Sequence, residues 1–326
     1  MDFDNEKELV KFLSEEVKDP ANPLLKPGTL VGNWVVKAYL GGGGFGEVYR
    51  VEHQKLSIIC ALKILKDLDP SNRERFFREV EILAREIHSG IPRFYELNQL
   101  DSRPYVIMEL LYPRELPNKD RDVAKYLHCL CGVVGALHQN GFVHRDIKPS
   151  NVLFRKNGEL VLVDYGLVKA MALGSNESEF STDITQPSLA VGTNRYAAPE
   201  QLMGEPANVN VVADIHSIGV LIDTCFNGSS PKSWRRIIQK ATSSIPKQRF
   251  ASVDMLDRAI RLRFLYLIFI ALGAGFLVMC FLIFYVLKDD RIVVDHPAQE
   301  VLPMQKESIK DVQKIRNAGD SASEWF

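Results

Sequence analysis

Apolar residues recur at helical spacing near the start of the chain and then give way to prolines. In residues 1–30, Leu9 and Leu13 lie four positions apart within an apolar cluster, and Pro20 and Pro23 follow it. Spacing of this kind is typical of a helix, and prolines interrupt helices. Residues 1–30 are therefore predicted to form a helix and a loop, which either dock on the next domain or act as a regulatory arm.

Short strand-like runs and then helical periodicity fill residues 31–258. The runs WVVKAYL and EVYRVEH flank a glycine cluster, and SIICALKIL follows as a buried strand. Residues 74–87 have the spacing of an amphipathic helix, RPYVIMELL is another strand, and helices dominate after Arg121. This order predicts an α+β fold with a small β-rich lobe at 31–109, a larger helical lobe at 110–258, and a cleft between them.

Residues 264–287 contain 24 consecutive positions without a charged side chain. As a helix this segment would be about 36 Å long, enough to cross a hydrocarbon layer of roughly 30 Å. Arg261 and Arg263 precede it, whereas acidic residues accompany Lys288 on the other side. Because cytoplasmic flanks carry the excess of basic residues, we expect a single-pass membrane protein with the preceding domain in the cytoplasm. The polar tail, residues 288–326, is expected on the opposite side.

The composition is that of a folded and nearly neutral protein. The chain is 46% hydrophobic and 25% charged, and its net charge is -1, so no basic field favours a nucleic-acid partner. The five cysteines are scattered without a CxxC pair or zinc-like spacing, which indicates reduced thiols. The acidic N-terminus lacks the apolar core of a cleavable signal peptide.

A glycine cluster between two predicted strands is the first candidate for chemistry. Residues 41–48 read GGGGFGEV and match the pattern GxGxxGxV. Glycines allow backbone N–H groups to approach phosphate oxygens closely. A flexible loop or a dinucleotide-binding turn would also contain such glycines, but the latter opens into a helix, whereas this turn opens into a strand.

Lys63 is the second candidate because it lies inside the apolar strand IICALKIL. A buried lysine is costly unless it is paired, although a lysine at a strand end can also extend its ammonium group into solvent. Glu79, sixteen residues later on the predicted helix, can supply the partner charge.

Three further motifs follow in a fixed order. HRDIKPSN at residues 144–151 is followed by DYG at 164–166 and by APE at 198–200. With this order and spacing, behind a glycine loop and a strand lysine, the chain resembles the eukaryotic-like (Hanks-type) serine/threonine protein kinase family. The resemblance covers residues 31–258 and implies the two-lobed protein kinase fold, with ATP and Mg²⁺ as cofactors and Mn²⁺ as an alternative ion.

The resemblance implies a role for each matching residue. Lys63, paired with Glu79, would hold the α- and β-phosphates. Asp146 would accept or orient the proton of the substrate hydroxyl, and Lys148 would neutralise charge on the transferred group. The residues that would contact ATP are Gly41, Gly43, Gly46, Val48, Ala61, Lys63, Met108 as gatekeeper, Glu109 and Leu111 of the hinge, and Leu153. The residues that would hold the metal are Asn151 and Asp164.

Structural roles are implied as well. The predicted hydrophobic spine between the lobes consists of Leu83, Phe94, His144 and Tyr165. Asp214 would anchor the catalytic loop, and Glu200 would pair with Arg249. The chain departs from the family at Tyr165, usually Phe, at His216, usually Trp, and after residue 221, where the αG region that often docks substrates is shortened or missing.

The implied function is that of a membrane-anchored serine/threonine protein kinase in a bacterial inner membrane, which transfers the ATP γ-phosphate to protein hydroxyls in signalling. Lys148 and the pair Gly192-Thr193 favour serine and threonine over tyrosine. The alternative is a membrane-tethered pseudokinase scaffold, which the intact motifs disfavour. A small-molecule kinase is disfavoured by the intact APE segment at 198–200.

Autophosphorylation and self-association are expected too. Residues 175–188 are polar and contain six serines and threonines, so this segment is either an activation site or an unregulated loop. Arg145 would bind a phosphate there, with Thr185 as the favoured acceptor. Ala271 and Gly275 form a small-xxx-small pair through which two membrane helices could associate.

Overall fold

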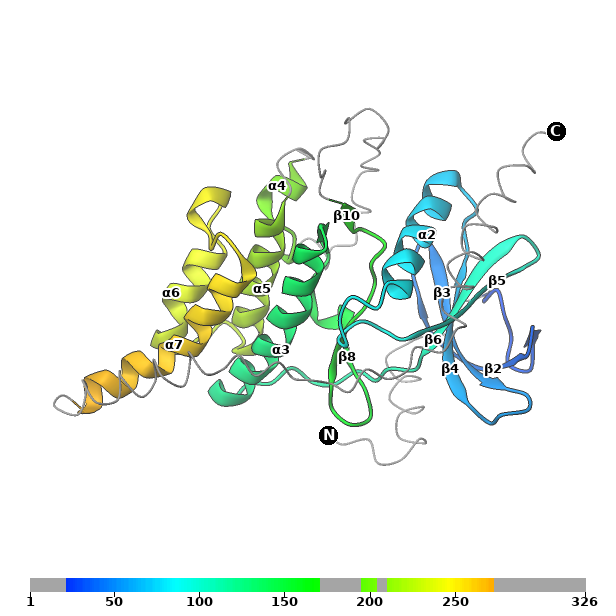
Figure 1. The fold of residues 1–326 in the computed structure, drawn as a ribbon, viewed down its shortest axis with the longest axis horizontal. Helices are drawn as coiled ribbons and strands as arrows, with labels where there is room; N and C mark the ends of the chain where they lie inside the picture. Colours follow the sequence, from blue (N-terminus) through cyan, green and yellow to red (C-terminus); the bar gives the residue numbers. More distant parts are fainter. Residues whose placement is uncertain (1–21, 171–194, 204–209, 273–326) are drawn as a thin grey trace.

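The computed structural model describes residues 22–170, 195–203 and 210–272. It has one lobe of strands with a single long helix and a second lobe made mostly of helices (Figure 1). The strands are β1 (Leu30–Val31), β2 (Trp34–Gly42), β3 (Gly46–His53), β4 (Ile59–Leu65), β5 (Phe94–Leu100), β6 (Arg103–Glu109), β7 (Phe142–Val143), β8 (Val152–Phe154), β9 (Leu160–Leu162) and β10 (Lys169–Ala170). The helices are α2 (Pro70–Ala84), α3 (Asp120–Gln139), α4 (Pro199–Leu202), α5 (Val211–Cys225), α6 (Lys232–Ala241) and α7 (Val253–Leu272), with 3-10 turns at Pro149–Asn151 and Pro246–Gln248. The predicted α+β order, β-rich and then helical, is confirmed.

Six strands form one antiparallel sheet in the order β1-β2-β3-β4-β6-β5. Side chains alternate between the two faces of a sheet. Along β6, Val106 joins the large core that contains Val80 and Leu83 of α2, whereas Tyr105 and Ile107 join a separate cluster on the other face. Helix α2 therefore covers one face of the sheet.

Helix α2 begins and ends earlier than predicted. It covers Pro70–Ala84 instead of 74–87. The start is set by Asp69, whose side chain accepts a hydrogen bond from the N–H of Ser71, with proline at the first helical position. The end is set near Glu86, whose φ of +47° is incompatible with a helix.

The described end of the N-terminal segment packs against the sheet. The N–H of Leu24 donates to the Glu47 carboxylate at 2.8 Å, and the N–H of Leu25 donates to the Tyr49 hydroxyl at 3.0 Å. Leu25 is buried in the cluster on the sheet face opposite α2. This part of the segment docks on the domain; the helix predicted before it lies outside the described residues.

The helical lobe contains α3, α5, α6 and α7 around one core. Helix α3 lies close to its predicted range of 121–141 and ends where Gly141 adopts a φ of +80°. Only residues 226–231 connect α5 to α6. The short connection agrees with the shortened αG region expected after residue 221.

Helix α7 continues without a break from the helical lobe to Leu272 (Figure 1). Its last nine residues are therefore the first nine of the predicted membrane segment. Residues 273–287 and the tail at 288–326 lie outside the described residues. Within the part of the chain that the structure describes, no helix has the length and apolar character needed to cross a membrane.

Arg263 fixes α7 to two other helices just before the predicted membrane segment. Its guanidinium donates to the Asp120 carboxylate of α3 at 2.9 Å. The guanidinium carbon lies 3.8 Å from the centre of the Trp234 ring on α6. This contact is well inside the range of a cation–π interaction, so Arg263 links the middle of α7 to the first turns of α3 and α6.

Candidate functional site

The glycine-rich turn lies between β2 and β3, as predicted. The N–H of Gly43 donates to the carbonyl oxygen of Gly46 at 2.9 Å, which closes the turn. A Cβ at Gly46 would lie 2.9 Å from the carbonyl oxygen of Ile64 on β4, and Gly41 has a φ of +151°. Side chains are therefore disfavoured at both positions. Gly43 has open space where its Cβ would be, so a ligand can approach its backbone.

Lys63 and Glu79 meet across the interface between β4 and α2. The Lys63 ammonium lies 2.7 Å and 2.6 Å from the two carboxylate oxygens of Glu79. It also lies 3.6 Å from the carboxylate of Asp164, which follows β9 in the helical lobe. The Lys63 charge therefore connects the two lobes.

Electrostatics keep Lys63 and Asp164 of this cluster ionised. Burial alone would lower the pKa of the Lys63 ammonium, but the charges of Glu79 and Asp164 outweigh it and raise that pKa above its ordinary value. Burial would likewise raise the pKa of the Asp164 carboxyl, yet the charge of Lys63 holds it below its ordinary value. At neutral pH, Lys63 is protonated and Asp164 is ionised.

Asp146 is held between two residues of its own loop. Lys148 donates to its carboxylate at 2.6 Å. The side-chain amide of Asn151 donates to the backbone carbonyl of Asp146 at 2.8 Å and to its carboxylate at 3.0 Å. Three predicted site residues are therefore in contact, and Asp146 has a defined orientation.

The loop that carries Asp146 is anchored from beneath by Asp214 of α5. Its carboxylate accepts hydrogen bonds from the N–H groups of His144 at 2.9 Å and Arg145 at 2.7 Å. His138 Nε2 of α3 lies 2.8 Å from the same carboxylate. Burial would raise the pKa of Asp214, but these partners, His138 first, hold it below its ordinary value. Asp214 therefore anchors the loop as an anion, as predicted.

Two site residues have a backbone conformation that is rare outside glycine. Arg145 has a φ of +71° and Asp164 a φ of +67°. Arg145 is held there by its bond to Asp214 and by Gln201, whose amide donates to the Arg145 carbonyl oxygen at 2.9 Å. Strain of this kind persists where the surrounding contacts enforce it and is concentrated at functional sites.

The predicted spine contains tyrosine at position 165 in place of phenylalanine, and the added hydroxyl has a hydrogen-bond partner. Leu83, His144 and Tyr165 are buried, and Phe94 packs at the edge of the same core. The rings of His144 and Tyr165 meet edge to face with centroids 5.2 Å apart. The Tyr165 hydroxyl donates to the carbonyl oxygen of Leu162 at 2.6 Å, so the change from phenylalanine leaves no buried donor unpaired. His216 is buried beside the backbone of Tyr196 and close to the Glu200–Arg249 pair.

The residues predicted to contact adenine come from both lobes. Val48 pairs with Lys63 in the sheet register, and Ala61 pairs with Met108, so these positions lie on the adjoining strands β3, β4 and β6. Glu109 ends β6. Tyr112, which directly follows Leu111, exchanges backbone hydrogen bonds with Phe154, which directly follows Leu153. The hinge, residues 109–111, therefore leads the chain past β8.

The donor set at Asn151 and Asp164 suits a hard cation. Because the amide nitrogen of Asn151 already donates to Asp146, its amide oxygen is the atom left for a metal. The Asp164 side chain is 48% exposed. Mg²⁺ prefers such oxygen ligands and usually takes only one or two from the protein, completing its shell with phosphate oxygens and water.

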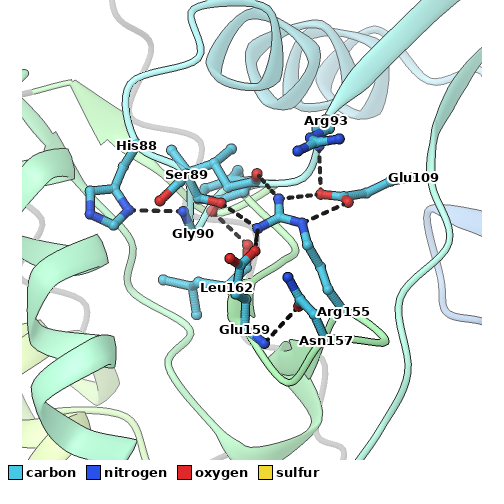
Figure 2. Close-up of polar contacts among 11 residues, drawn as sticks. His88, Ser89, Gly90, Arg93, Glu109, Arg155, Asn157, Glu159 and Leu162 are labelled. Atoms are coloured by element: carbon cyan, nitrogen blue, oxygen red, sulfur yellow. Dashed lines mark hydrogen bonds and ion pairs between the residues drawn. The ribbon is translucent and has the colours of Figure 1, made fainter. Parts of the chain in front are cut away.

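Polar residues near the site that were not predicted include Gln201, described above, and two more. His138 supports Asp214, and Arg155 forms a two-pronged ion pair with Glu109 of the hinge (Figure 2). Neither residue belongs to a motif. His138 lies in the last turn of its helix, where basic residues are favourable, but that signal does not identify its partner, which is 76 positions away.

Known proteins resemble this chain across the two lobes. Residues 34–261 match the family model of the protein kinase domain. The probable serine/threonine-protein kinase PknB of Corynebacterium glutamicum is 32% identical over 209 residues, covering 60% of this chain and 31% of that protein. The DNA damage-responsive serine/threonine-protein kinase RqkA of Deinococcus radiodurans is 36% identical over 220 residues, covering 64% of this chain and 32% of that protein.

The match to these relatives therefore spans about a third of their length. Among solved structures, the kinase domain of Mycobacterium tuberculosis PknI superposes with a TM-score of 0.55 at 23% identity, covering 74% of this chain and 100% of that one. That similarity supports the fold. Since the family model covers more than half of its length, the chain belongs to the protein kinase family.

Proposed function

We propose that this chain is an ATP-dependent serine/threonine protein kinase. The observation that carries the proposal is the ion cluster of Lys63, Glu79 and Asp164, which joins the two lobes beside the glycine-rich turn. Pseudokinases typically lack one of these charges. The names of the bacterial relatives support serine and threonine as acceptors.

Each side chain has one task in the transfer. Asp146 orients the substrate hydroxyl and accepts its proton as the hydroxyl oxygen bonds to the γ-phosphorus and the bond to the β,γ-bridging oxygen breaks, releasing ADP. Lys148, 2.6 Å from Asp146, is placed to offset charge on the transferred group. Lys63 orients the α- and β-phosphates. Mg²⁺ held by Asn151 and Asp164 would cancel negative charge on the phosphates.

Labelled ATP tests this proposal directly. The full chain, purified in nanodiscs and incubated with Mg²⁺ and γ-labelled ATP, is expected to label itself and an added general protein substrate. Acid hydrolysis should yield phosphoserine or phosphothreonine, and site mapping should locate the labelled residues. EDTA should abolish the transfer because the phosphate charge would then be uncompensated.

The competing function is a membrane-tethered pseudokinase scaffold. Such a protein would fold and bind partners but would label no protein in the same assay. That result, obtained with a folded chain across a range of ATP concentrations, would end the kinase proposal. Label recovered only as phosphotyrosine would contradict the choice of serine and threonine.

Arg145 supports autophosphorylation within this proposal. Its Nε and one Nη nitrogen are buried without a hydrogen-bond partner among the described residues. Burial lowers the pKa of its guanidinium, against the opposing effect of the Asp214 charge, and the positive charge of Arg78 adds to the lowering. A phosphate would supply charge and acceptors. The expected acceptors at 175–188, including Thr185, lie outside the described residues, so this step stays a prediction.

A membrane anchor completes the proposal, with the kinase domain in the cytoplasm of a bacterial inner membrane. The charge-free residues 264–287 and the continuity of α7 up to Leu272 support it. Self-association through Ala271 and Gly275 would follow from the same anchor and stays a prediction.

Protease treatment of spheroplasts tests the anchor. Protease added outside is expected to trim the chain after residue 288 and to spare residues 31–258 until the membrane is permeabilised. The protein should stay with the membrane in high salt and in alkaline carbonate. Digestion of the kinase domain from outside would contradict the orientation, and release by salt would contradict the membrane span.

A further inference from the structure

Arg155 contacts the hinge from the helical lobe (Figure 2). It directly follows β8, and its side chain reaches the Glu109 carboxylate through two parallel hydrogen bonds. Its Nε lies 2.8 Å from one carboxylate oxygen and its Nη2 lies 2.5 Å from the other. Two-pronged pairs between guanidinium and carboxylate are among the strongest and most directional polar contacts in proteins.

The same guanidinium also holds the loop that follows α2. It donates to the carbonyl oxygen of Ser89 at 2.7 Å and to that of Ile91 at 3.3 Å. Glu109 in turn accepts from the N–H of Arg93 at 2.9 Å, while its own N–H donates to the carbonyl oxygen of Arg93 at 3.0 Å. One side chain of the helical lobe therefore ties together the hinge and the residues before β5.

That loop also contacts the helical lobe directly. The N–H of Leu162 on β9 donates to the carbonyl oxygen of Gly90 at 2.9 Å (Figure 2). A Cβ at Gly90 would collide with the side chain of Val133 on α3. The loop is thus packed against two elements of that lobe, and Arg155 transmits its position to the hinge.

The Arg155–Glu109 pair is largely buried. The Arg155 side chain is 12% exposed and the Glu109 side chain 11% exposed, so water competes weakly for these charges. Glu159 contacts the same guanidinium at 3.2 Å but is 58% exposed and does not reach the hinge. Glu109 and Glu159 therefore differ in burial and in their contact with the hinge.

We infer that Arg155 is a positioning residue for nucleotide binding. Through its ion pair with the Glu109 side chain, it holds the hinge backbone at residues 109–111 in place for the edge of the adenine. The inference rests on the proposed site for ATP. Backbone N–H and C=O groups recognise a flat base only when they are pre-positioned, since ordering them on binding lowers affinity. Arg155 lies in no motif, and its role concerns nucleotide affinity, separate from the transfer step.

The test compares Arg155→Met, Glu109→Gln, which keeps the side-chain shape, and the double variant in the full chain. The Kd for a fluorescent ATP analogue and the KM for ATP are expected to rise about tenfold or more in each single variant. In Arg155→Met, the kcat at saturating ATP should change by less than about threefold, since Lys63, Asp146 and Asp164 are untouched. The double variant should lose far less than the product of the two single losses, because both remove the same contact.

Two further variants separate positioning from general damage. Glu159→Gln removes a charged partner of the same guanidinium without touching the hinge, and it should leave the Kd unchanged. Arg155→Lys should recover only part of the affinity, because an ammonium group cannot make the two-pronged contact. An unchanged Kd in folded Arg155→Met and Glu109→Gln, or an equal rise in Glu159→Gln, would overturn the inference. Direct binding keeps this test separate from the kinase proposal, since a chain that binds ATP without transferring phosphate would still report on Arg155.

Discussion

Replacing Lys63 by Met, or Asp164 by Asn, is expected to slow phosphate transfer by about a hundredfold to a thousandfold. Each change removes one charge from the cluster that joins the lobes, where Lys63 lies 3.6 Å from Asp164. The charges of Lys63 and Asp164 act on the phosphate groups, whose negative charge shifts in the transition state. We therefore expect a large loss in the rate of transfer and a smaller loss in the stability of the fold. Asp164→Asn should also raise the Mg²⁺ concentration needed for half-maximal activity.

Initial rates at saturating ATP over a series of Mg²⁺ concentrations measure both effects. Lys37→Met is the matched lysine control, because Lys37 pairs with Glu52 at 2.7 Å on the neighbouring strand but is 39% exposed. Asp101→Asn, in an exposed turn, is the matched aspartate control. Both controls should retain wild-type rates. Wild-type transfer by a folded Asp164→Asn protein would show that the metal assignment is wrong.

Replacing Arg249 by Met is expected to lower the free energy of unfolding by about 3–5 kcal/mol. Arg249 forms two hydrogen bonds with Glu200 at 2.6 Å and 2.7 Å, and the two side chains are 0% and 6% exposed. It also donates to the carbonyl oxygens of Val212 at 3.0 Å and Ser243 at 2.8 Å. The substitution leaves a buried carboxylate and two carbonyls without their donor. Urea unfolding of the full chain, followed by tryptophan fluorescence, measures the loss.

A surface pair provides the comparison. Arg85 and Glu81 approach to 2.5 Å, but both are 48% exposed, so Arg85→Met should change the unfolding free energy by no more than about 1 kcal/mol. The double variant Glu200→Met with Arg249→Met should recover part of the loss, since it leaves no buried charge unpaired. Equal urea midpoints for Arg249→Met and Arg85→Met would show that the buried pair does not brace the lobe.

The sequence predicted those contacts in which the residues belong to recognisable sequence patterns. The pairing of Lys63 with Glu79 followed from a lysine in an apolar strand and a carboxylate on the next helix, and both hydrogen bonds are present. Asp214 and the Glu200–Arg249 pair were placed by resemblance, and the structure shows their contacts. These contacts could be predicted because the fold shared by the family places the two partners next to each other.

Other features depend on geometry that no pattern encodes. The start of α2 was missed because Asp69 and Pro70 carry capping information that apolar periodicity ignores. Arg155 was missed because its partners, Glu109 and the carbonyls of Ser89 and Ile91, come together only after both lobes have folded. A polar residue at the end of a short strand looks like an ordinary surface residue until its tertiary neighbours are known.

Helix α7 bears on which proteins the kinase could reach. A flexible linker lets a tethered domain move over a distance that grows as the square root of the linker length. Helix α7, in contrast, continues through Arg263 to Leu272 as one helix. If the residues that follow cross a bilayer, the catalytic lobe stands at a set height and tilt above the lipid headgroups. Any rotation of the membrane segment about its own axis then turns that lobe with it. Substrates would be selected by how far their hydroxyl groups lie from the lipid surface.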